Sequence, residues 1–135
     1  MDMKLELVVL PVSDVDAAKA FYVDRAGFDL DVDVVVGDDF RVVQVTPPGS
    51  ACSITLMHNP EAAGTVNGLH LVVADIETAR AEVVARGLEA SEFFHFSDRG
   101  QTPGLDPQRA KYGSYFSFED PDGNGFLVQE VPPQS

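Results

Sequence analysis

Three residues in the second half of the chain have side chains that could orient or act on a small molecule. His70 stands in the strand-like run Leu69–Ala74, Tyr115 stands in the run Ser114–Glu119, and Gln129 follows on the last such run. A histidine can serve as an acid, a base or a ligand anchor because it titrates near neutral pH, and an amide or phenol can orient a ligand by hydrogen bonding. The same types also suit a hydrogen-bonded interior histidine and a satisfied buried polar pair, and both interpretations stay open.

Alternation along the predicted strands separates residues that pack inward from residues that could face a ligand. Successive side chains of a strand point to opposite faces, so positions two apart share a face. Pairing the last two strands through their phenylalanines would put Ser117 beside Leu127 and Tyr115 beside Gln129. The residues predicted to line a ligand pocket are Leu7, Val9, Thr55, Met57, His70, Tyr115, Ser117, Leu127 and Gln129.

These residues lie on a pattern that occurs twice in the chain. Residues 8–28 and 69–89 each contain a strand-like run, a helix with an apolar stripe and a glycine after the helix. Asp14 and Asp75 stand at matching positions, where their carboxylates can cap the two helices. A long repeat that is present only twice indicates a duplicated half-domain.

The repeat predicts a first module over residues 1–57, a linker over 58–67 and a second module over 68–135, which together form one domain. The second module contains a long loop, 97–113, that is rich in Gly, Pro and charge. The predicted strands are Leu5–Val12, Asp29–Val36, Phe40–Thr46, Ser53–Met57, Leu69–Ala74, Glu89–Phe96, Ser114–Glu119 and Phe126–Val131.

The long loop could act as a lid over a bound ligand. Arg99 and Arg109, with Lys111, bring positive charge to this segment of an acidic chain. A guanidinium is well shaped to clamp a ligand carboxylate. The plainer interpretation, which we prefer, is solvation or pairing with Asp98 and Asp106.

A second histidine, His95, lies just before the long loop. Its neighbours Phe94 and Phe96 would face opposite to it on a strand. We therefore expect His95 to be exposed, with a place at the pocket mouth as the alternative.

Composition excludes several classes of partner and points to the cytoplasm. A net charge of −13 disfavours binding to nucleic acid or to anionic lipid, which both reward Lys and Arg. The sequence contains no apolar run long enough to cross a bilayer, and its first residues do not read as a secretion signal. Cys52 is the only cysteine, so an internal disulfide is excluded and a cysteine-based zinc site is disfavoured.

Three segments resemble the vicinal-oxygen-chelate superfamily, which contains glyoxalases, bleomycin resistance proteins and extradiol dioxygenases. They are PVSDVDAAKAFYVDRAGFDL (11–30), DIETARAEVVARGLE (75–89) and YGSYFSFEDPDGNGFLVQEV (112–131). The resemblance implies an α+β fold of two βαβββ modules, whose curled mixed sheet forms a cup with the helices outside. It also implies a homodimer, since members commonly dimerise.

The resemblance also locates the positions where metal-dependent members carry their ligands. Those members place His, Gln or Glu seven residues before each capping Asp, and Glu on each module's final strand. Here the four positions hold Leu7, Gly68, Thr55 and Leu127. None of these side chains provides the imidazole or carboxylate ligand that a divalent ion needs, so we expect no metal cofactor at them. A displaced site built from His70, Gln129 and Glu6 is the alternative.

The leading hypothesis is therefore a protein that binds a small, largely apolar molecule in a metal-free cup, with His70 and Gln129 fixing its orientation. The chemically different hypothesis is a lyase, isomerase or dioxygenase relative. Such an enzyme would use a shifted divalent-metal site or His70 as a general acid–base. A dimeric module that serves only for protein interaction is a third possibility.

Overall fold

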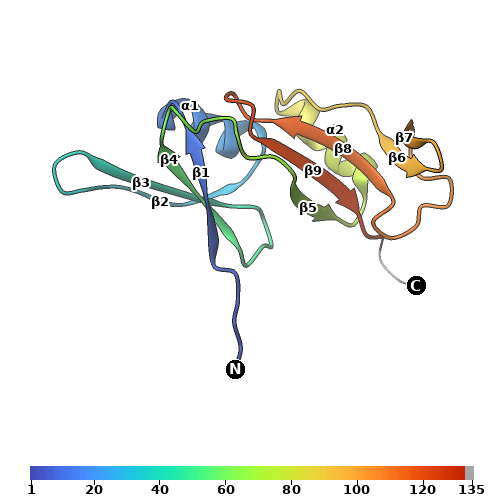
Figure 1. Cartoon of the computed structure of the whole chain (residues 1–135), viewed down its shortest axis with the longest axis horizontal. Coiled ribbons are helices and arrows are strands. Elements are labelled where there is room, and N and C mark those ends of the chain that lie inside the picture. The colour runs from blue at the N-terminus through green and yellow to red at the C-terminus, as the bar shows by residue number, and fades with distance from the viewer. Residues whose placement is uncertain (133–135) are drawn as a thin grey trace. The chain divides into compact units, whose positions relative to one another are not determined.

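The computed structural model describes residues 1–132, and the chain divides into two compact units (Figure 1). The first unit consists of Met1–Val66 together with Asp120–Asn124, and the second begins at Asn67–Glu119 and resumes at Gly125. The chain therefore passes from one unit to the other three times. No helix within residues 1–132 has the length and apolar character needed to span a membrane.

The first unit is a four-stranded mixed sheet with one helical segment. Its strands lie in the order β1-β4-β3-β2, with β1 parallel to β4 and the other neighbours antiparallel. In Figure 1 the β2–β3 ribbon extends well beyond β1 and β4. The elements are β1 (Leu7–Val12), α1 (Val15–Ala20), the π-helical turn η1 (Phe21–Arg25), β2 (Asp29–Val36), β3 (Phe40–Thr46) and β4 (Ser53–His58).

The second unit repeats this arrangement and adds one strand. Its sheet has the order β5-β9-β8-β6-β7, in which β5 is parallel to β9 and the extra strand β7 pairs with the outer side of β6. The predicted α+β fold of duplicated mixed-sheet modules is confirmed. The elements are β5 (Leu69–Val73), α2 (Ile76–Ala85), β6 (Phe94–Ser97), β7 (Gly100–Pro103), β8 (Ser114–Glu119) and β9 (Gly125–Glu130).

Both helices begin where the repeated aspartates predict. The Asp14 carboxylate accepts a hydrogen bond from the Ala17 backbone N–H at 3.1 Å. The Asp75 carboxylate accepts from the N–H groups of Glu77 and Thr78 at 3.1 and 3.2 Å. Each carboxylate thus satisfies amide groups that have no partner inside the helix, and its negative charge lies at the positive end of the helix dipole.

In each unit the helix and one face of the sheet form the core. Alternate strand residues are buried on this helix side, while the residues between them stay half-buried or exposed. We call the face that carries these half-buried and exposed residues the open face of the sheet. The buried side chains of the first unit include Leu10, Val12, Ala18, Phe21, Tyr22, Val43, Val45, Ile54 and Leu56, and those of the second include Ile76, Leu88, Phe116, Phe118, Phe126 and Val128.

Two predicted strands begin later than expected. The first begins at Leu7 and not at Leu5. Residues 1–6 are exposed, and the Glu6 carbonyl accepts a hydrogen bond from the Ser53 N–H at the start of β4. The strand predicted over Glu89–Phe96 is observed as β6, which begins at Phe94 and ends at Ser97. The residues before β6 are bound by a side chain of α2: the Arg80 guanidinium donates hydrogen bonds to the carbonyl groups of Ala90 and Ser91.

The long loop predicted over residues 97–113 is partly a hairpin. Gly100–Pro103 forms β7, joined to β6 by a tight turn in which Gly100 has a φ of 87°. A positive φ of this kind costs glycine little and most other residues more. The turn therefore lets β7 fold back at once and become the outer strand of the second sheet.

His95 is buried, so the prediction that it is exposed was wrong. Its side chain lies on the helix side of β6, and Nδ1 is 2.8 Å from the Gly104 carbonyl oxygen. The β7 hairpin and the segment after it cover this position. A histidine whose ring nitrogen has a backbone partner can be buried at modest cost.

The Asp-Pro-Asp-Gly-Asn turn is a structural centre of the first unit. The Asp120 carboxylate accepts hydrogen bonds from the buried Tyr22 hydroxyl at 2.8 Å and from the Asn124 side-chain amide at 2.9 Å. The same amide group also donates to the Pro11 carbonyl. Burial, followed by the charge of Asp120, raises the pKa of Tyr22 far above its ordinary value. The phenol therefore remains a hydrogen-bond donor at all physiological pH values.

Candidate functional site

Five of the nine predicted pocket residues meet on the open face of the second sheet. His70 is in register with Leu127, which is in turn in register with Ser117. In the next row Gln129 is in register with Tyr115. The predicted pairing of the last two strands is therefore confirmed, while a ligand-binding role for these residues stays a prediction.

An aromatic cluster lies at the outer end of this face. Phe94 is in register with Tyr115, and their rings are nearly parallel, with centroids 5.5 Å apart and planes 10° apart. Phe96 stands almost perpendicular to both rings, with centroids 5.3 Å from Tyr115 and 5.9 Å from Phe94. We call these three rings the aromatic corner.

Phe94 and Phe96 were not predicted to lie beside Tyr115. Strand alternation correctly placed them opposite His95, but no pairing was predicted for this strand. They contact Tyr115 because of the register in which β6 pairs with β8. The signal available in the sequence was the alternation itself, Phe-His-Phe, which puts two aromatic rings on one face.

The His70 ring is fixed by a local contact. Its Nδ1 is 2.7 Å from the Gly68 carbonyl oxygen, and the side chain is exposed on the open face. A carbonyl oxygen only accepts hydrogen bonds, so the contact favours a proton on Nδ1. In the neutral ring Nε2 is then the acceptor, and it is directed away from the backbone.

Other polar groups of this face have no protein partner within residues 1–132. This holds for the Gln129 amide, the Tyr115 hydroxyl and the Ser117 hydroxyl, all on half-buried residues. Half-buried polar groups that are not used by the fold can bond water or a ligand. The open face of the second sheet thus combines apolar side chains with unengaged donors and acceptors.

The other four predicted pocket residues lie on the open face of the first sheet. Val9 is in register with Thr55, and Leu7 and Met57 lie on the same face of their strands. Leu7, Thr55 and Met57 are half-buried and Val9 is 48% exposed. None of these four side chains is aromatic.

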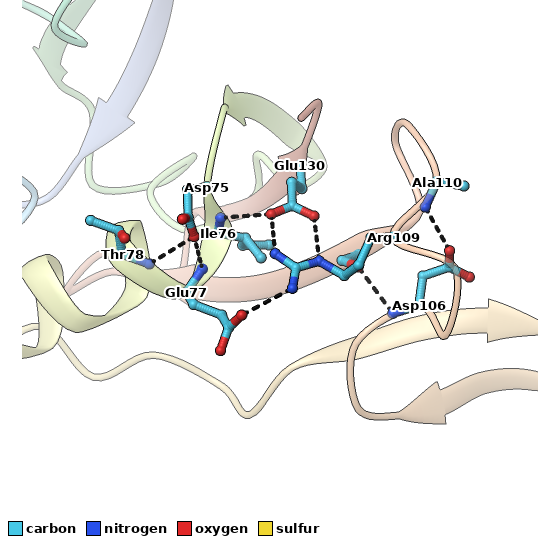
Figure 2. Close-up of polar contacts among 9 residues, drawn as sticks. Asp75, Ile76, Glu77, Thr78, Asp106, Arg109, Ala110 and Glu130 are labelled. Carbon is cyan, nitrogen blue, oxygen red and sulfur yellow. Dashed lines mark hydrogen bonds and ion pairs between the residues drawn. The ribbon is translucent and has the colours of Figure 1, made fainter. Parts of the chain in front are cut away.

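Arg109, one of the two predicted lid residues, lies on the helix side of the second unit (Figure 2). Its Nε and Nη2 donate to the two oxygens of Glu130 at 2.8 and 2.5 Å, and its Nη1 donates to Glu77 at 2.9 Å. Glu130 also accepts the Ile76 backbone N–H at 3.0 Å, at the start of α2. The guanidinium therefore joins the loop to the end of β9 and to the first turn of α2.

The ion pair with Arg109 stabilises the buried Glu130 carboxylate in its charged form. Glu130 is 1% exposed, and its hydrogen bonds from Arg109 hold its pKa below the ordinary value despite the opposing effect of burial. The same hydrogen bonds raise the pKa of Arg109. Because Nε, Nη1 and Nη2 all donate to carboxylates, Arg109 is held as a structural cation. Its guanidinium pairs with Glu130 and Glu77, whereas the preferred interpretation had paired it with Asp98 or Asp106.

The second predicted lid residue, Arg99, has a different environment. It is exposed in the turn between β6 and β7, where its backbone N–H donates to the Ser97 hydroxyl at 3.2 Å. Within residues 1–132, no hydrogen bond or ion pair joins Arg99 or Arg109 to the open-face residues around His70.

The donor set does not fit a divalent metal. Among residues 1–132, no group of three or more His, Cys, Asp or Glu side chains lies close enough to share an ion. The positions that the family resemblance assigns to ligands hold aliphatic, glycine or hydroxyl residues, and His70 has only uncharged neighbours in register. Divalent ions need several imidazole or oxygen ligands at fixed geometry, and these residues do not provide them.

Comparison with known proteins gives relatives along nearly the whole chain. A structure of TnmS3, described as an antibiotic binding protein from Streptomyces sp. CB03234, is 30% identical, covers 98% of both chains and has a TM-score of 0.75. A glyoxalase/bleomycin resistance protein from the same organism is 31% identical over 94% of this chain and 100% of its own, with a TM-score of 0.72. The uncharacterized protein YetH of Bacillus subtilis (strain 168) is 25% identical over 96% of this chain and 100% of its own.

The family model that matches covers residues 4–128, which takes in most of both units and every predicted pocket residue except Gln129. The repeated strand–Asp–helix unit and the two mixed sheets agree with it. The chain therefore belongs to the Glyoxalase/Bleomycin resistance protein/Dioxygenase superfamily.

Proposed function

We propose that this protein binds a small, largely apolar molecule on the open faces of its sheets, without a resident metal ion. The observation that carries the proposal is the open face of the second sheet. It presents aromatic and aliphatic side chains beside polar groups that the fold leaves unengaged. Binding sites for small molecules typically combine an apolar lining with a few polar groups that fix orientation.

The lack of a cationic side chain among the named open-face residues supports an uncharged ligand. None of the open-face residues named above is Lys or Arg, and the chain as a whole carries a net charge of −13. An anionic molecule would find no cation to offset its desolvation, and it would be repelled at long range. The antibiotic-binding description of a 30% identical structure supports the same class of function.

The test is a binding measurement combined with elemental analysis. Protein purified without chelators should contain no stoichiometric Zn, Ni, Mn or Fe. Calorimetry should detect binding of 2-naphthol, an uncharged bicyclic alcohol, to the intact chain. Val72→Asp places a carboxylate on the open face at a side chain that is already 55% exposed, so it should weaken binding and spare the fold. Val84→Asp, at a 44% exposed position of α2, is the matched control and should leave binding unchanged.

Acid–base catalysis through His70 is the alternative function, and one observation favours it. The contact between Nδ1 and the Gly68 carbonyl leaves Nε2 of the neutral ring as a free acceptor on the open face. One metal ion per chain that disappears in His70→Ala, or turnover of a bound compound that disappears in His70→Gln, would replace the binding proposal with this one.

We also propose that the protein is a cytoplasmic homodimer, as the family resemblance implies. Light scattering on the purified chain tests the dimer, and a mass of one chain (14.6 kDa) would overturn it. Fractionation of cells that express the untagged protein tests the location.

A further inference from the structure

We propose that Asn67 is a site of spontaneous deamidation, and that the modified residue disturbs the backbone that holds the His70 ring. The proposal names a covalent modification site, with water as its co-reactant. It does not depend on the proposed function, because neither the reaction nor its effect on His70 needs a ligand.

The chain contains two Asn-Gly pairs, Asn67-Gly68 and Asn124-Gly125. Asparagine is a thermolabile residue. It is most reactive before glycine, because the missing Cβ leaves the following amide nitrogen open to approach the asparagine side chain. The two pairs have the same sequence chemistry, so their surroundings decide which of them reacts.

The reaction is a cyclisation followed by hydrolysis. The Gly68 nitrogen forms a bond to Cγ of Asn67 and gives up its proton, and the side-chain nitrogen of Asn67 leaves as ammonia with that proton. Water then opens the cyclic imide at either of its carbonyl groups. One opening gives aspartate, and the other gives isoaspartate, in which the main chain runs through Cβ and Cγ. Both products add a negative charge where asparagine had none.

The Asn67-Gly68 pair is open to this reaction. Both residues are exposed, and they lie in the irregular segment 65–68 between a turn and β5. Within residues 1–132, neither the Asn67 side-chain amide nor the Gly68 N–H has a hydrogen-bond partner. The attacking nitrogen and the attacked carbonyl group can therefore approach each other without breaking a hydrogen bond of the fold.

The Asn124-Gly125 pair is protected. Asn124 is fully buried, and its side-chain amide donates to the Pro11 carbonyl and to the Asp120 carboxylate, both at 2.9 Å. Its side-chain oxygen accepts the Val66 N–H at 3.1 Å, and Gly125 begins β9. Turning this side chain toward the next nitrogen would break these hydrogen bonds inside the core, so the reaction requires local unfolding.

The modification would act on His70 through Gly68. The Gly68 carbonyl oxygen lies 2.7 Å from Nδ1 of His70. Isoaspartate at position 67 adds a carbon to the main chain directly before this glycine. It also removes the Asn67 side chain from its place against Gly125, where a Cβ on that glycine would lie 2.6 Å from Oδ1. We therefore expect Gly68 to shift and its contact with the His70 ring to weaken.

Ageing the intact protein at mildly alkaline pH, followed by peptide mapping with mass spectrometry, tests the site. The peptide that contains Asn67 should gain the mass of an amide-to-acid conversion, and an isoaspartate methyltransferase should label it. The peptide that contains Asn124 should gain this mass at least about tenfold more slowly, because its reaction waits for local unfolding. In protein unfolded with urea the two peptides should react at similar rates.

Two glutamine substitutions locate the reaction. Asn67→Gln keeps a side-chain amide but requires a larger ring that closes less readily, so the mass change at position 67 should disappear over the same period. Asn59→Gln is the matched control, since Asn59 is also exposed but precedes a proline. It should leave the reaction at Asn67 unchanged.

Nuclear magnetic resonance of the histidine rings measures the effect on His70. The buried His95, whose Nδ1 lies 2.8 Å from the Gly104 carbonyl oxygen, is the internal reference. Ageing should shift the ring signals of His70 and spare those of His95, and in Asn67→Gln neither should shift.

Two results would overturn the modification site. One is an Asn67 peptide that stays unmodified in the folded protein while the unfolded protein reacts, and the other is equal rates at Asn67 and Asn124 in the folded protein. Deamidation at Asn67 that leaves the His70 ring signals unchanged would overturn the proposed effect on the ring.

Discussion

Arg109→Met is expected to destabilise the second unit by leaving a buried carboxylate without its cation. Methionine keeps an unbranched apolar chain of similar length but removes all the N–H donors. Glu130 would retain the Ile76 N–H as a partner and lose the two guanidinium hydrogen bonds at 2.8 and 2.5 Å. At neutral pH the variant must either bury a poorly compensated charge or protonate Glu130.

The magnitude follows from the burial of the two partners. Removing one member of a fully buried ion pair typically costs 3–5 kcal/mol. Glu130 is 1% exposed but the Arg109 side chain is 38% exposed, so solvent already screens part of the interaction. We therefore expect a loss of about 2–3 kcal/mol at pH 7, which for a chain of this size lowers Tm by about 10 °C.

The pH dependence provides the sharper test. In the native protein the pKa of Glu130 lies below its ordinary value of 4.5, so the unfolded chain binds more protons and stability falls as the pH drops through this range. In Arg109→Met burial without the guanidinium raises the pKa of Glu130, so the folded variant binds the extra proton and gains stability on acidification. The stability difference should be largest at pH 7 and should shrink below about pH 5.

Urea denaturation followed by far-ultraviolet circular dichroism at several pH values measures this difference, and the chain has no tryptophan to report it by fluorescence. Lys111→Met is the control, because Lys111 is an exposed cation of the same segment without a partner within residues 1–132. It should shift stability by less than about 0.5 kcal/mol. A second substitution, Glu130→Gln, should recover part of the stability of Arg109→Met. An Arg109→Met effect that equals the Lys111→Met effect, or that is constant from pH 4 to pH 7, would refute the reasoning.

Three further predictions concern other parts of the chain. Gly64→Ala should cost about 3 kcal/mol or more, because its φ is +83° and the new Cβ would lie 2.2 Å from the Asp122 carbonyl oxygen; Gly37→Ala, with a φ of +71° and open space around it, should cost about 1 kcal/mol in the same urea titration. Tyr22→Phe should cost about 1–3 kcal/mol through the lost hydrogen bond to Asp120, whereas Tyr112→Phe, at an exposed ring, should cost almost nothing. His70→Ala should leave Tm within about 2 °C but weaken 2-naphthol binding, and a large loss of stability would show that the ring is structural.

The features that the sequence predicts well are those encoded by neighbouring residues. Asp14 and Asp75 cap their helices because a carboxylate needs only the next turn of backbone to do so. The strands Asp29–Val36 and Phe40–Thr46 are found with the predicted bounds, and the Phe118–Phe126 pairing follows from a short connector that fixes the register.

The features that escape prediction depend on residues far apart in the chain. β7 has the sequence Gly-Gln-Thr-Pro, with no alternation to mark it, and it is a strand because β6 offers it hydrogen bonds. Alternation does put Glu130 on the apolar face with Val128, which signals a need for a cation. It cannot identify Arg109, which stands in a loop 21 residues earlier and reaches Glu130 from a left-handed backbone conformation, with a φ of 49°.

The assignment of Asp120–Asn124 to the first unit means that the two halves of this duplicated chain are no longer interchangeable parts. A fragment ending at Val66 would have the Tyr22 phenol buried without the carboxylate that accepts its hydrogen bond, and the Pro11 carbonyl without the Asn124 amide. The first half can complete its interior only with a piece that the second half encodes. Separately expressed halves should therefore regain native structure on mixing, and a gene copy of the first half alone would not suffice for an independent protein.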